Sequence, residues 1–421
     1  MAHLNPRRTI EELKELRALT GDENGAQRVA FTETWARART WYTAKLTELP
    51  VGVKQDAAGN LWATLRGSSE RELWIGGHLD SVPNGGWLDG CLNVLAGLEV
   101  LRRVNAQYQG KPPVTVRVVD WCDEEGARFG RSLFGSSAVS GFFDPTDLKA
   151  RTDKDGVRLE DAAIAHGIDI NRALEAGGEK KNAAAYIELH IEQGPVLEKL
   201  GLPLGVVLGT KGVERHAITF FGQEAHSGST PMTQRRDALG AAAKLSLEVR
   251  EIAKKHSDAV CTVGSVKTFP GIVTAVVGRC EITLDQRDLD AGILAQMNHE
   301  ARDASERFAN EENVTVEWKK IWDIEPIAFH PQLVEFCDQA ILEAQATLEI
   351  MPVSHRLPSG PLHDAAEICR AGIPTVMMFV QSLRGISHNK IEDTLEEHLE
   401  LSVRAFDRLA SKVIDWIENG A

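Results

Sequence analysis

The sequence lacks the features that mark a membrane-spanning or a secreted protein. Its longest apolar runs are short, such as residues 374–380, whereas a membrane span needs about 20 apolar residues. The first eight residues, MAHLNPRR, are not followed by the apolar segment that a secretory signal contains. We therefore expect a cytoplasmic protein without a membrane partner.

Closely spaced cysteines and an excess of basic residues are also missing. The six cysteines, at positions 91, 122, 261, 280, 337 and 369, are scattered. This spacing indicates neither a disulfide framework nor a thiolate zinc site, and it fits free thiols in a reducing cytosol. The 47 Lys and Arg residues are outnumbered by 61 Asp and Glu residues, giving a net charge of −14. Because nucleic-acid binding needs a concentrated basic face, no nucleic-acid partner is expected.

The 421 residues are enough for two domains of ordinary size or for one large domain. Apolar, β-branched runs alternate with helical patterns along much of the chain. The expected strands include 73–77, 114–120, 186–190, 206–210 and 375–380, and the expected helices include about 91–105, 331–347 and 394–418. This alternation predicts an α/β domain in which helices flank a central mixed sheet.

The pattern changes between about 214 and 324. A strand at 217–221 is followed by a long helix at about 234–256, strands at 260–268 and 279–285, a helix at about 291–309 and a strand at 314–321. This β-α-β-β-α-β order is typical of a ferredoxin-like layer. We predict an inserted domain over 213–325, within a first domain formed by 1–212 and 326–421.

Four clusters of histidines and carboxylates each follow a predicted strand. They contain His78, Asp80 and Asp89; the acidic run 123–125; His190; and His388. Ligands of open α/β sheets bind at the carboxyl edge of the strands, so these side chains are expected to meet there. Each cluster alone has a plain alternative, such as a polar strand end or a solvated acidic turn. Four strand ends of this kind together favour a metal site.

The residue types indicate what such a metal site would do. Two histidines with carboxylates suit zinc or manganese better than calcium. Structural zinc usually uses closely spaced thiolates, which the sequence lacks, so a catalytic site is favoured. Asp80 could accept a hydrogen bond from the His78 imidazole and orient it. One carboxylate of the acidic run could bind metal while another takes a proton from metal-bound water.

The inserted domain contributes two further candidates. His226 lies in a loop of small residues, ahead of the Thr230-Pro231 pair at which the long helix is expected to begin. Its alternative is an incidental exposed histidine. Arg287 ends a predicted strand, where its guanidinium could grip a carboxylate with two parallel hydrogen bonds. Its alternative is a surface ion pair with Asp285 or Asp288.

The sequence resembles the amidohydrolase branch of the two-metal aminoacylase and carboxypeptidase superfamily. That branch contains N-carbamoyl-L-amino-acid hydrolases, allantoate amidohydrolases and bacterial β-ureidopropionases. The matching stretches are GHLDSVPNGGWLDG (77–90), EEGARFGRSLFGS (124–136), ELHIEQGPVLE (188–198), AHSGSTPMTQRRDAL (225–239), PSGPLHDA (358–365) and GISHNKIEDT (385–394). They occur in the expected order over most of the chain. ELHIEQGPVLE points to this branch rather than to the peptidases of the superfamily.

The resemblance implies two divalent metal ions per subunit, which would be zinc, manganese or cobalt. The implied ligands are His78 and His190 for one metal, Glu125 and His388 for the other, and Asp89 as the bridge between them. Glu124 would be the general base, acting with a hydroxide that bridges the metals. Asp80 would orient His78.

The resemblance also implies residues for the substrate and for a second subunit. His226 would enter the active site of the partner in a homodimer and stabilise the developing oxyanion. Gln193 and Arg287 would hold the small-molecule substrate, with Arg287 on its carboxylate. Thr274 and Gly360 would also lie at the substrate.

Several residues depart from the pattern of the resembled family. Asn93 stands where glycine is usual, and Thr274 replaces an asparagine that would touch the substrate. Pro361 and Leu362 replace an Ala-Gly pair, and Gln381 replaces a proline. None of these positions is an implied metal ligand, so we expect the departures to affect the choice of substrate rather than the metal chemistry.

The expected activity is hydrolysis of the carbamoyl C–N bond of N-carbamoyl-L-amino acids or related ureido acids. The alternatives are an allantoate-type amidohydrolase and an amidohydrolase of N-acyl amino acids with a bulkier acyl group. A non-catalytic binding protein on the same fold is the last alternative. A lost metal ligand or a lost base would favour it, and neither is seen.

Overall fold

The computed structural model describes residues 4–348 and 351–420, which form two compact units. The larger unit comprises Met1–Leu208, Phe329–Leu357 and Leu362–Ala421. The smaller unit comprises Gly209–Ala328 and the short segment Pro358–Pro361. A piece of chain from the C-terminal part thus belongs to the smaller unit.

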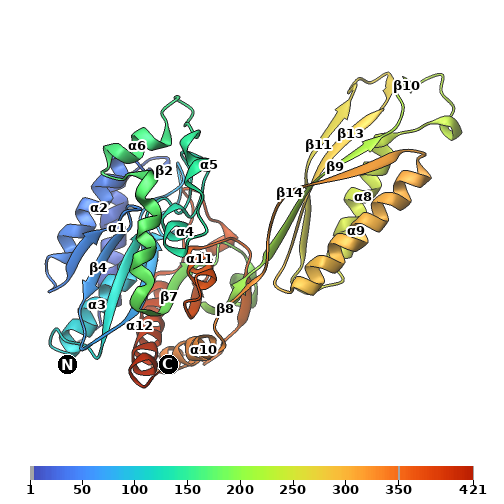
Figure 1. Cartoon of the computed structure of the whole chain (residues 1–421). Helices are drawn as coiled ribbons and strands as arrows, with labels where there is room; N and C mark the ends of the chain where they lie inside the picture. Colours follow the sequence, from blue (N-terminus) through green and yellow to red (C-terminus); the bar gives the residue numbers. More distant parts are fainter. Residues whose placement is uncertain (1–3, 349–350, 421) are drawn as a thin grey trace. The chain divides into compact units, whose positions relative to one another are not determined.

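A nine-stranded mixed sheet lies mostly in the larger unit (Figure 1). Its order is β15-β8-β17-β7-β5-β6-β4-β3, and β16 pairs with β8. The strands are β3 (Gly52–Gln55), β4 (Leu61–Leu65), β5 (Ser69–His78), β6 (Val114–Trp121), β7 (Ala183–Ile191), β8 (Leu204–Thr210), β15 (Ile327–Ala328), β16 (Arg356–Ser359) and β17 (Thr375–Val380). A short hairpin of β1 (Gly21–Asp22) and β2 (Gly25–Ala26) stands apart from it. The central mixed sheet predicted from the sequence is confirmed.

Four neighbouring strands of this sheet, β6, β5, β7 and β17, are parallel. His78 pairs with Trp121 across β5 and β6, and His190 pairs with Phe379 across β7 and β17. Every residue of β6 is buried, as expected for a parallel strand covered on both faces. The carboxyl ends of these strands therefore form one edge of the sheet.

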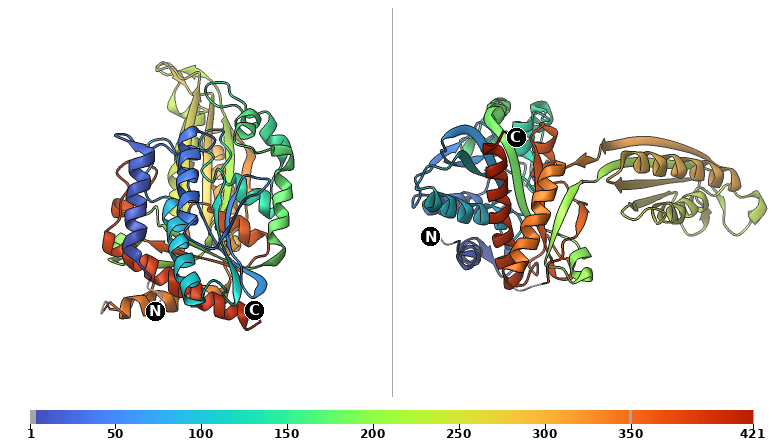
Figure 2. Two further views of the ribbon diagram at one scale, coloured as in Figure 1. Left: turned by 90° about the vertical axis from the view of Figure 1, so that its left-hand side faces the viewer. Right: turned by 90° about the horizontal axis from the view of Figure 1, so that it is seen from below.

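Helices cover both faces of the large sheet (Figure 2). One layer contains α1 (Pro6–Thr20), α3 (Cys91–Gln107), α10 (Pro331–Ala346) and α12 (Glu396–Glu418), with α2 (Glu33–Leu46) packed on α1; the other contains α4 (Phe134–Ser140) and α11 (Asp364–Arg370). Shorter helices are α5 (Pro145–Lys149), α6 (Leu159–Ala165) and α7 (Val196–Leu200). Within the described residues, no helix is both long enough and apolar enough to cross a membrane.

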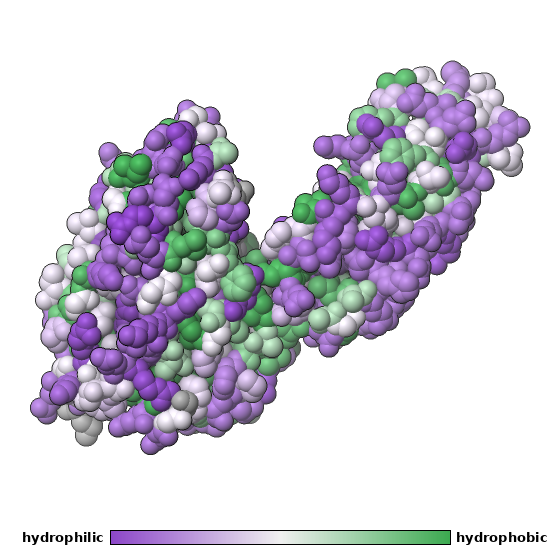
Figure 3. Space-filling model, viewed as in Figure 1, coloured by the Kyte–Doolittle hydropathy of each residue, from purple (hydrophilic) through white to green (hydrophobic). Residues whose placement is uncertain are grey.

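The smaller unit is built on an antiparallel sheet of four strands in the order β11-β13-β9-β14. Its elements are β9 (Gly212–Phe221), α8 (Ala238–Ala253), β11 (Val260–Phe269), β13 (Arg279–Asp288), α9 (Ala291–Glu311) and β14 (Thr315–Ile324). They follow one another as β-α-β-β-α-β, as the sequence pattern indicates. Alternate residues of β13, such as Ile282 and Leu284, pack with Leu245 of α8 and Met297 of α9. The outer surface along α9 is mostly hydrophilic (Figure 3).

The first helix of the smaller unit begins later than predicted. The expected start near Pro231 is wrong, because Met232–Gln234 form a separate 3-10 turn and α8 begins only at Ala238. The Asp237 side chain accepts hydrogen bonds from the backbone N–H groups of Leu239 and Gly240, which is a strong helix-start signal. The preceding residues form a loop next to β10 (Ala225–His226), which pairs with β12 (Ala275–Val276).

A buried ion pair joins α2 to the end of β6. The Arg39 Nε donates to Asp120 Oδ2 at 2.6 Å, and its guanidinium also donates to the Gly59 carbonyl at 2.6 Å. The other Asp120 oxygen accepts the backbone N–H of Leu79 at 2.7 Å. Because Leu79 lies between His78 and Asp80, this pair fixes the backbone that follows β5.

We predict that Arg39→Leu strongly destabilises the protein. The substitution leaves the Asp120 carboxylate buried without its cation, which typically costs about 3–5 kcal/mol. The free energy of unfolding in urea measures this change. Arg37→Leu is the matched control, since Arg37 is exposed on the same helix and its loss should cost less than about 0.5 kcal/mol. If Arg39→Leu were as stable as the control, the ion pair between Arg39 and Asp120 would not stabilise the backbone that follows β5.

Candidate metal centre

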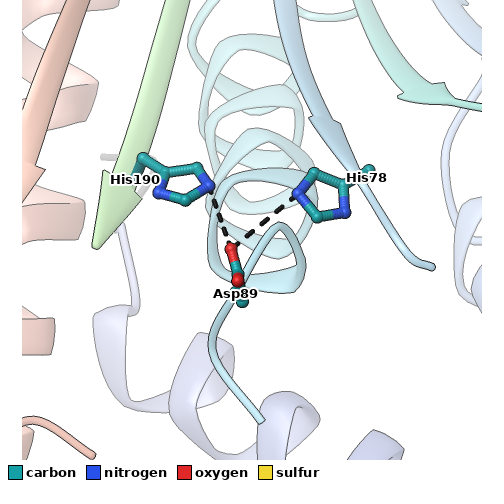
Figure 4. A group of neighbouring side chains, drawn as sticks. All are labelled: His78, Asp89 and His190. Carbon is teal, nitrogen blue, oxygen red and sulfur yellow. Dashed lines mark ion pairs between the residues drawn. The ribbon is translucent and has the colours of Figure 1, made fainter. Parts of the chain in front are cut away.

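The implied metal ligands meet at the carboxyl edge of the parallel strands. His78 is the last residue of β5, and His190 lies at the end of β7. Asp89 lies in the loop before α3, between the two imidazole rings (Figure 4). Gly90 lets the loop approach this closely, because it has φ +67° and an added Cβ would lie 2.4 Å from the His78 ring.

Asp89 is the centre of two groups of possible ligand atoms. Its Oδ1 lies 3.1 Å from His190 Nε2 and 3.9 Å from His78 Nε2. Its Oδ2 lies 3.3 Å from His388 Nε2, which in turn lies 3.4 Å from Glu125 Oε2. Within each group the ligand atoms all lie within 4.8 Å of one another. The two groups therefore share one carboxylate and differ in the oxygen that they use.

The site combines buried carboxylates with imidazoles of different basicity. Burial lowers the pKa of His78 to about 4. Burial acts in the same direction on His190, but its hydrogen bond to Asp89 and the charges of Asp89 and Glu188 together outweigh burial and raise its pKa to about 9. Burial and then the charge of Asp89 raise the pKa of Glu125 to about 8. Burial, followed by neighbouring carboxylates, raises the pKa of Glu124 well above its ordinary value.

This donor set fits divalent metal ions. Imidazole nitrogens with carboxylate oxygens are the usual ligands of zinc, and they also suit manganese and cobalt. Three of the groups, His78, Asp89 and His190, are almost fully buried. Buried carboxylates this close together repel one another unless a cation lies between them.

Backbone carbonyls orient both buried histidines. His78 Nδ1 lies 3.2 Å from the Asp80 carbonyl oxygen, and His190 Nδ1 lies 2.8 Å from the Ile191 carbonyl oxygen. A carbonyl can only accept, so each Nδ1 carries a hydrogen, and Nε2 is the ring nitrogen that faces Asp89.

Asp80 contacts His78 through its backbone carbonyl and has further partners for its carboxylate. Its Oδ1 lies 3.6 Å from His78 Nδ1, beyond a good hydrogen bond, because the carbonyl of Asp80 already takes that position. The carboxylate accepts instead the backbone N–H groups of Glu124 and Glu125, at 3.3 and 3.1 Å. Asp80 therefore holds the two glutamates in place, and Glu124 Oε2 lies 3.8 Å from His78 Nε2.

Gln193 and His388 have left-handed backbone conformations, with φ of +56° and +54°. Such conformations are strained for residues other than glycine, and they persist where surrounding contacts fix them. The Gln193 backbone N–H donates to Ser382 Oγ at 3.0 Å, and its side-chain amide donates to Asp89 Oδ2 at 2.9 Å. The structure thus places the expected substrate residue Gln193 beside the shared carboxylate.

Sequence reasoning missed Glu392 and Ser387. Glu392 is 2% exposed, and its Oε1 accepts the backbone N–H groups of Leu88 and Asp89, both at 3.1 Å. Its Oε2 accepts the Ser387 hydroxyl at 2.8 Å. Glu392 therefore links the loop of Asp89 to the segment that carries His388. The sequence signal that could have identified Glu392 is its position four residues after His388, inside the matching stretch 385–394.

His363 was also missed, although it lies inside the matching stretch 358–365. Its ring is buried against His190, with ring centroids 4.4 Å apart. Its Nε2 has no hydrogen-bond partner among the described residues. Burial and then the charge of His190 hold its pKa well below the ordinary value. A neutral imidazole with an unused nitrogen therefore lies beside the metal-ligand candidates.

The other four predicted site residues lie in the smaller unit, at two places. His226 lies beside Thr274, because β10 pairs with β12 and the Ser227 N–H donates to the Thr274 carbonyl at 2.9 Å. Both His226 and Thr274 are exposed. Arg287 donates from Nε to Asp285 Oδ1 at 2.8 Å and from Nη1 to the Gly360 carbonyl at 3.0 Å. The ion pair with Asp285, the alternative considered for Arg287, is therefore present.

The chain belongs to the peptidase family M20/M25/M40, whose family model matches residues 74–412. The family is metal-dependent, in agreement with the two groups of ligand candidates. The membership inferred from the motifs is confirmed.

Two relatives and one solved structure extend this result. The chain is 35% identical over 377 residues to an N-carbamoyl-L-amino acid amidohydrolase of Geobacillus stearothermophilus, covering 89% of this chain and 90% of that protein. It is 32% identical over 397 residues to an allantoate amidohydrolase of Escherichia coli K12, covering 92% and 93%. A hydantoinase/carbamoylase family amidase from Burkholderia multivorans has a similar structure, with a TM-score of 0.83, 32% identity and 97% coverage of both chains.

We predict that Glu392→Ala weakens divalent metal binding. Without the carboxylate, the backbone of Asp89 loses its acceptor, and partners of this kind typically contribute 10–100-fold to metal affinity. Titration calorimetry with Zn²⁺ and with Mn²⁺ measures the affinity. Glu392→Gln is the conservative control, because its carbonyl oxygen can still accept both N–H groups. If Glu392→Ala bound Zn²⁺ and Mn²⁺ with unchanged affinity, Glu392 would not contribute to metal binding through Asp89.

Proposed function

We propose that the protein is a metal-dependent amidohydrolase that cleaves the carbamoyl C–N bond of N-carbamoyl-L-amino acids or related ureido acids. The observation that carries this proposal is the pair of ligand groups sharing Asp89, with the buried Glu124 beside them. The names of the two relatives support a ureido substrate.

We propose two metal positions for this reaction. His78, His190 and Asp89 would hold one divalent ion, and Asp89, Glu125 and His388 the other. Zinc, manganese or cobalt would serve. An ion held by these residues would supply Lewis acidity for the carbamoyl oxygen and would make the attacking water more acidic.

Glu124 is the proposed general base. Its carboxylate is buried next to His78, and its backbone is fixed by the bond to Asp80. A carboxylate in this place takes a proton from the attacking water and delivers it to the leaving nitrogen.

Arg287 is the proposed partner of the substrate carboxylate. A guanidinium has five N–H donors, of which three are used, two by Asp285 and one by the Gly360 carbonyl. Within the described part of the chain two donors remain, enough for a bidentate carboxylate. Gly360 would then act by holding Arg287 rather than by touching the substrate itself. Gln193 and Thr274 complete the proposed substrate contacts.

We propose that residues 213–325 form an inserted ferredoxin-like domain, which serves as a lid and joins two subunits in a homodimer. The edge strand β11 supports the pairing role. It is ten residues long, largely exposed, and has Lys267 as its one charged residue. A long edge with so little charge is prone to pair with another chain. A cytoplasmic location remains a prediction from the sequence.

A substrate panel tests the proposed activity. The protein loaded with zinc, manganese or cobalt is given N-carbamoyl-L-amino acids, allantoate and N-acyl amino acids with bulkier acyl groups, and release of ammonia or of the free amino acid is measured. We expect turnover of the carbamoyl amino acids, its loss with a chelator and its return with metal. Carboxamide analogues, which lack the group for Arg287, should be poor substrates. Metal binding without any turnover would instead favour a binding protein.

We predict that Glu124→Gln and Glu125→Gln have different effects on metal binding and on kcat. Glu124→Gln should keep bound metal and lose about 10²–10⁴-fold in kcat, the typical contribution of a general acid–base step. Glu125→Gln should lose metal, because a neutral amide is a poor ligand. Metal analysis and steady-state kinetics on both variants measure the difference. A Glu124→Gln enzyme with most of its kcat would move the base to another residue.

We predict that His226 acts in the partner subunit. His226→Ala and Glu124→Gln would each be inactive, but a mixed dimer would combine the natural Glu124 of one chain with the natural His226 of the other. Random subunit exchange makes about half of the dimers mixed, each with one working site of two, so about a quarter of natural activity should return. Proven exchange without recovery would contradict the role in the partner.

A further inference from the structure

His226 has one ring nitrogen bound within its own turn. The backbone N–H of Gly228 donates to His226 Nδ1 at 3.1 Å. A backbone amide can only donate, so Nδ1 must present a lone pair. In a neutral imidazole the other nitrogen then carries the hydrogen. The bond therefore selects the tautomer in which Nε2 is protonated.

Gly228 lets the ring lie over its amide. An added Cβ at this position would lie 3.3 Å from His226 Cε1 and 3.6 Å from His226 Nδ1. The first of these distances is tighter than an ordinary van der Waals contact. A side chain here would push the ring away from the N–H that it accepts.

Arg235 ties the same turn together from its C-terminal side. Its Nη2 donates to the Ser227 carbonyl at 2.6 Å and its Nε donates to the Thr230 carbonyl at 3.2 Å. The Thr230 N–H also donates to the His226 carbonyl at 3.1 Å. One guanidinium thus spans the residues on both sides of Gly228.

We infer that Gly228 and Arg235 lock His226 in the Nε2–H tautomer, so that its exposed ring presents a hydrogen-bond donor through Nε2. Arg235 is a positioning residue that acts through the turn. The use of this donor on the oxygen of the substrate rests on the proposed function. The tautomer itself depends only on contacts inside the smaller unit.

The tautomer is measured on the natural, metal-loaded protein labelled with ¹⁵N-histidine. In alkaline solution we expect an unprotonated Nδ1 and a protonated Nε2 for His226, identified by the signals lost in His226→Gln. In Arg235→Met the two shifts should move towards those of free imidazole. A protonated Nδ1, or the mixture found in free imidazole, in the natural protein would overturn the inference whatever the activity.

Arg236 provides a matched control for Arg235. It is the next residue along the chain, and its Nε donates to the Asn313 carbonyl at 2.8 Å rather than to the turn. Arg236→Met should leave the His226 signals and the kinetics unchanged. Arg235→Met should lower kcat at unchanged metal content, and Arg235→Lys, which can reach one of the carbonyls, should restore part of it. Equal effects of the two Met variants on the ring signals would contradict the role of Arg235.

Two substitutions of His226 identify the nitrogen that works. The amide nitrogen of Gln extends to the position of Nε2, whereas the amide of Asn matches Nδ1. Loss of one donor to a developing oxyanion typically costs about 10²–10³ in kcat. We expect Asn to show that loss and Gln to retain at least ~10-fold more activity than Asn. Equal losses of kcat in the Asn and Gln variants would refute the Nε2 donor. Natural activity in both variants would refute the catalytic role of His226, and the NMR measurement alone would then decide the tautomer.

Discussion

Repulsion among carboxylates at one sheet edge is the constraint on which the rest of this structure depends. Asp80, Asp89, Asp120 and Glu124 are all buried there, and each charge needs its own compensation. Asp120 has Arg39, and the carboxylate of Asp80 has two backbone N–H groups. Asp89 is held by Glu392 through its backbone and faces three imidazoles. Divalent cations would balance the negative charge that remains on Asp89, Glu124 and Glu125. The same buried carboxylates therefore require support from the fold and provide the proposed metal ligands and base.

The parallel strands bring the candidate ligands together at one edge of the sheet. β5, β6 and β7 end side by side, so ligands far apart in sequence meet without a long loop. The remaining ligands come from tight turns, where Gly90 allows close approach to His78 and His388 adopts a left-handed conformation. Backbone carbonyls, rather than further acids, orient both buried histidines, so no extra charge is added.

In the smaller unit, hydrogen bonds likewise fix the orientation of polar side chains that are proposed to contact the substrate. Asp285 and the Gly360 carbonyl hold Arg287 in one orientation, and Gly228 with Arg235 does the same for the turn of His226. Long or exposed side chains lose conformational entropy when they bind, and holding them beforehand reduces that loss. The segment 358–361 belongs to this unit although it follows β15 by many residues, because its carbonyl groups bind Arg287 and the N–H of Lys211.

The sequence by itself determined the parallel strands of the large sheet, the long helices α3, α9, α10 and α12, the family and the residues gathered around Asp89, because periodicity and motifs are local signals. It misplaced the start of α8, since the Asp237 cap outweighed Pro231 as the start signal. It left Glu392, Ser387 and His363 without roles. Only the tertiary structure decided these points: the Glu392 carboxylate meets Asp89 across some 300 residues of chain, and the carbonyl that orients His78 belongs to the backbone. Hydrogen bonds between distant segments and to backbone atoms leave no pattern in the order of side chains, and they exist only once the chain has folded.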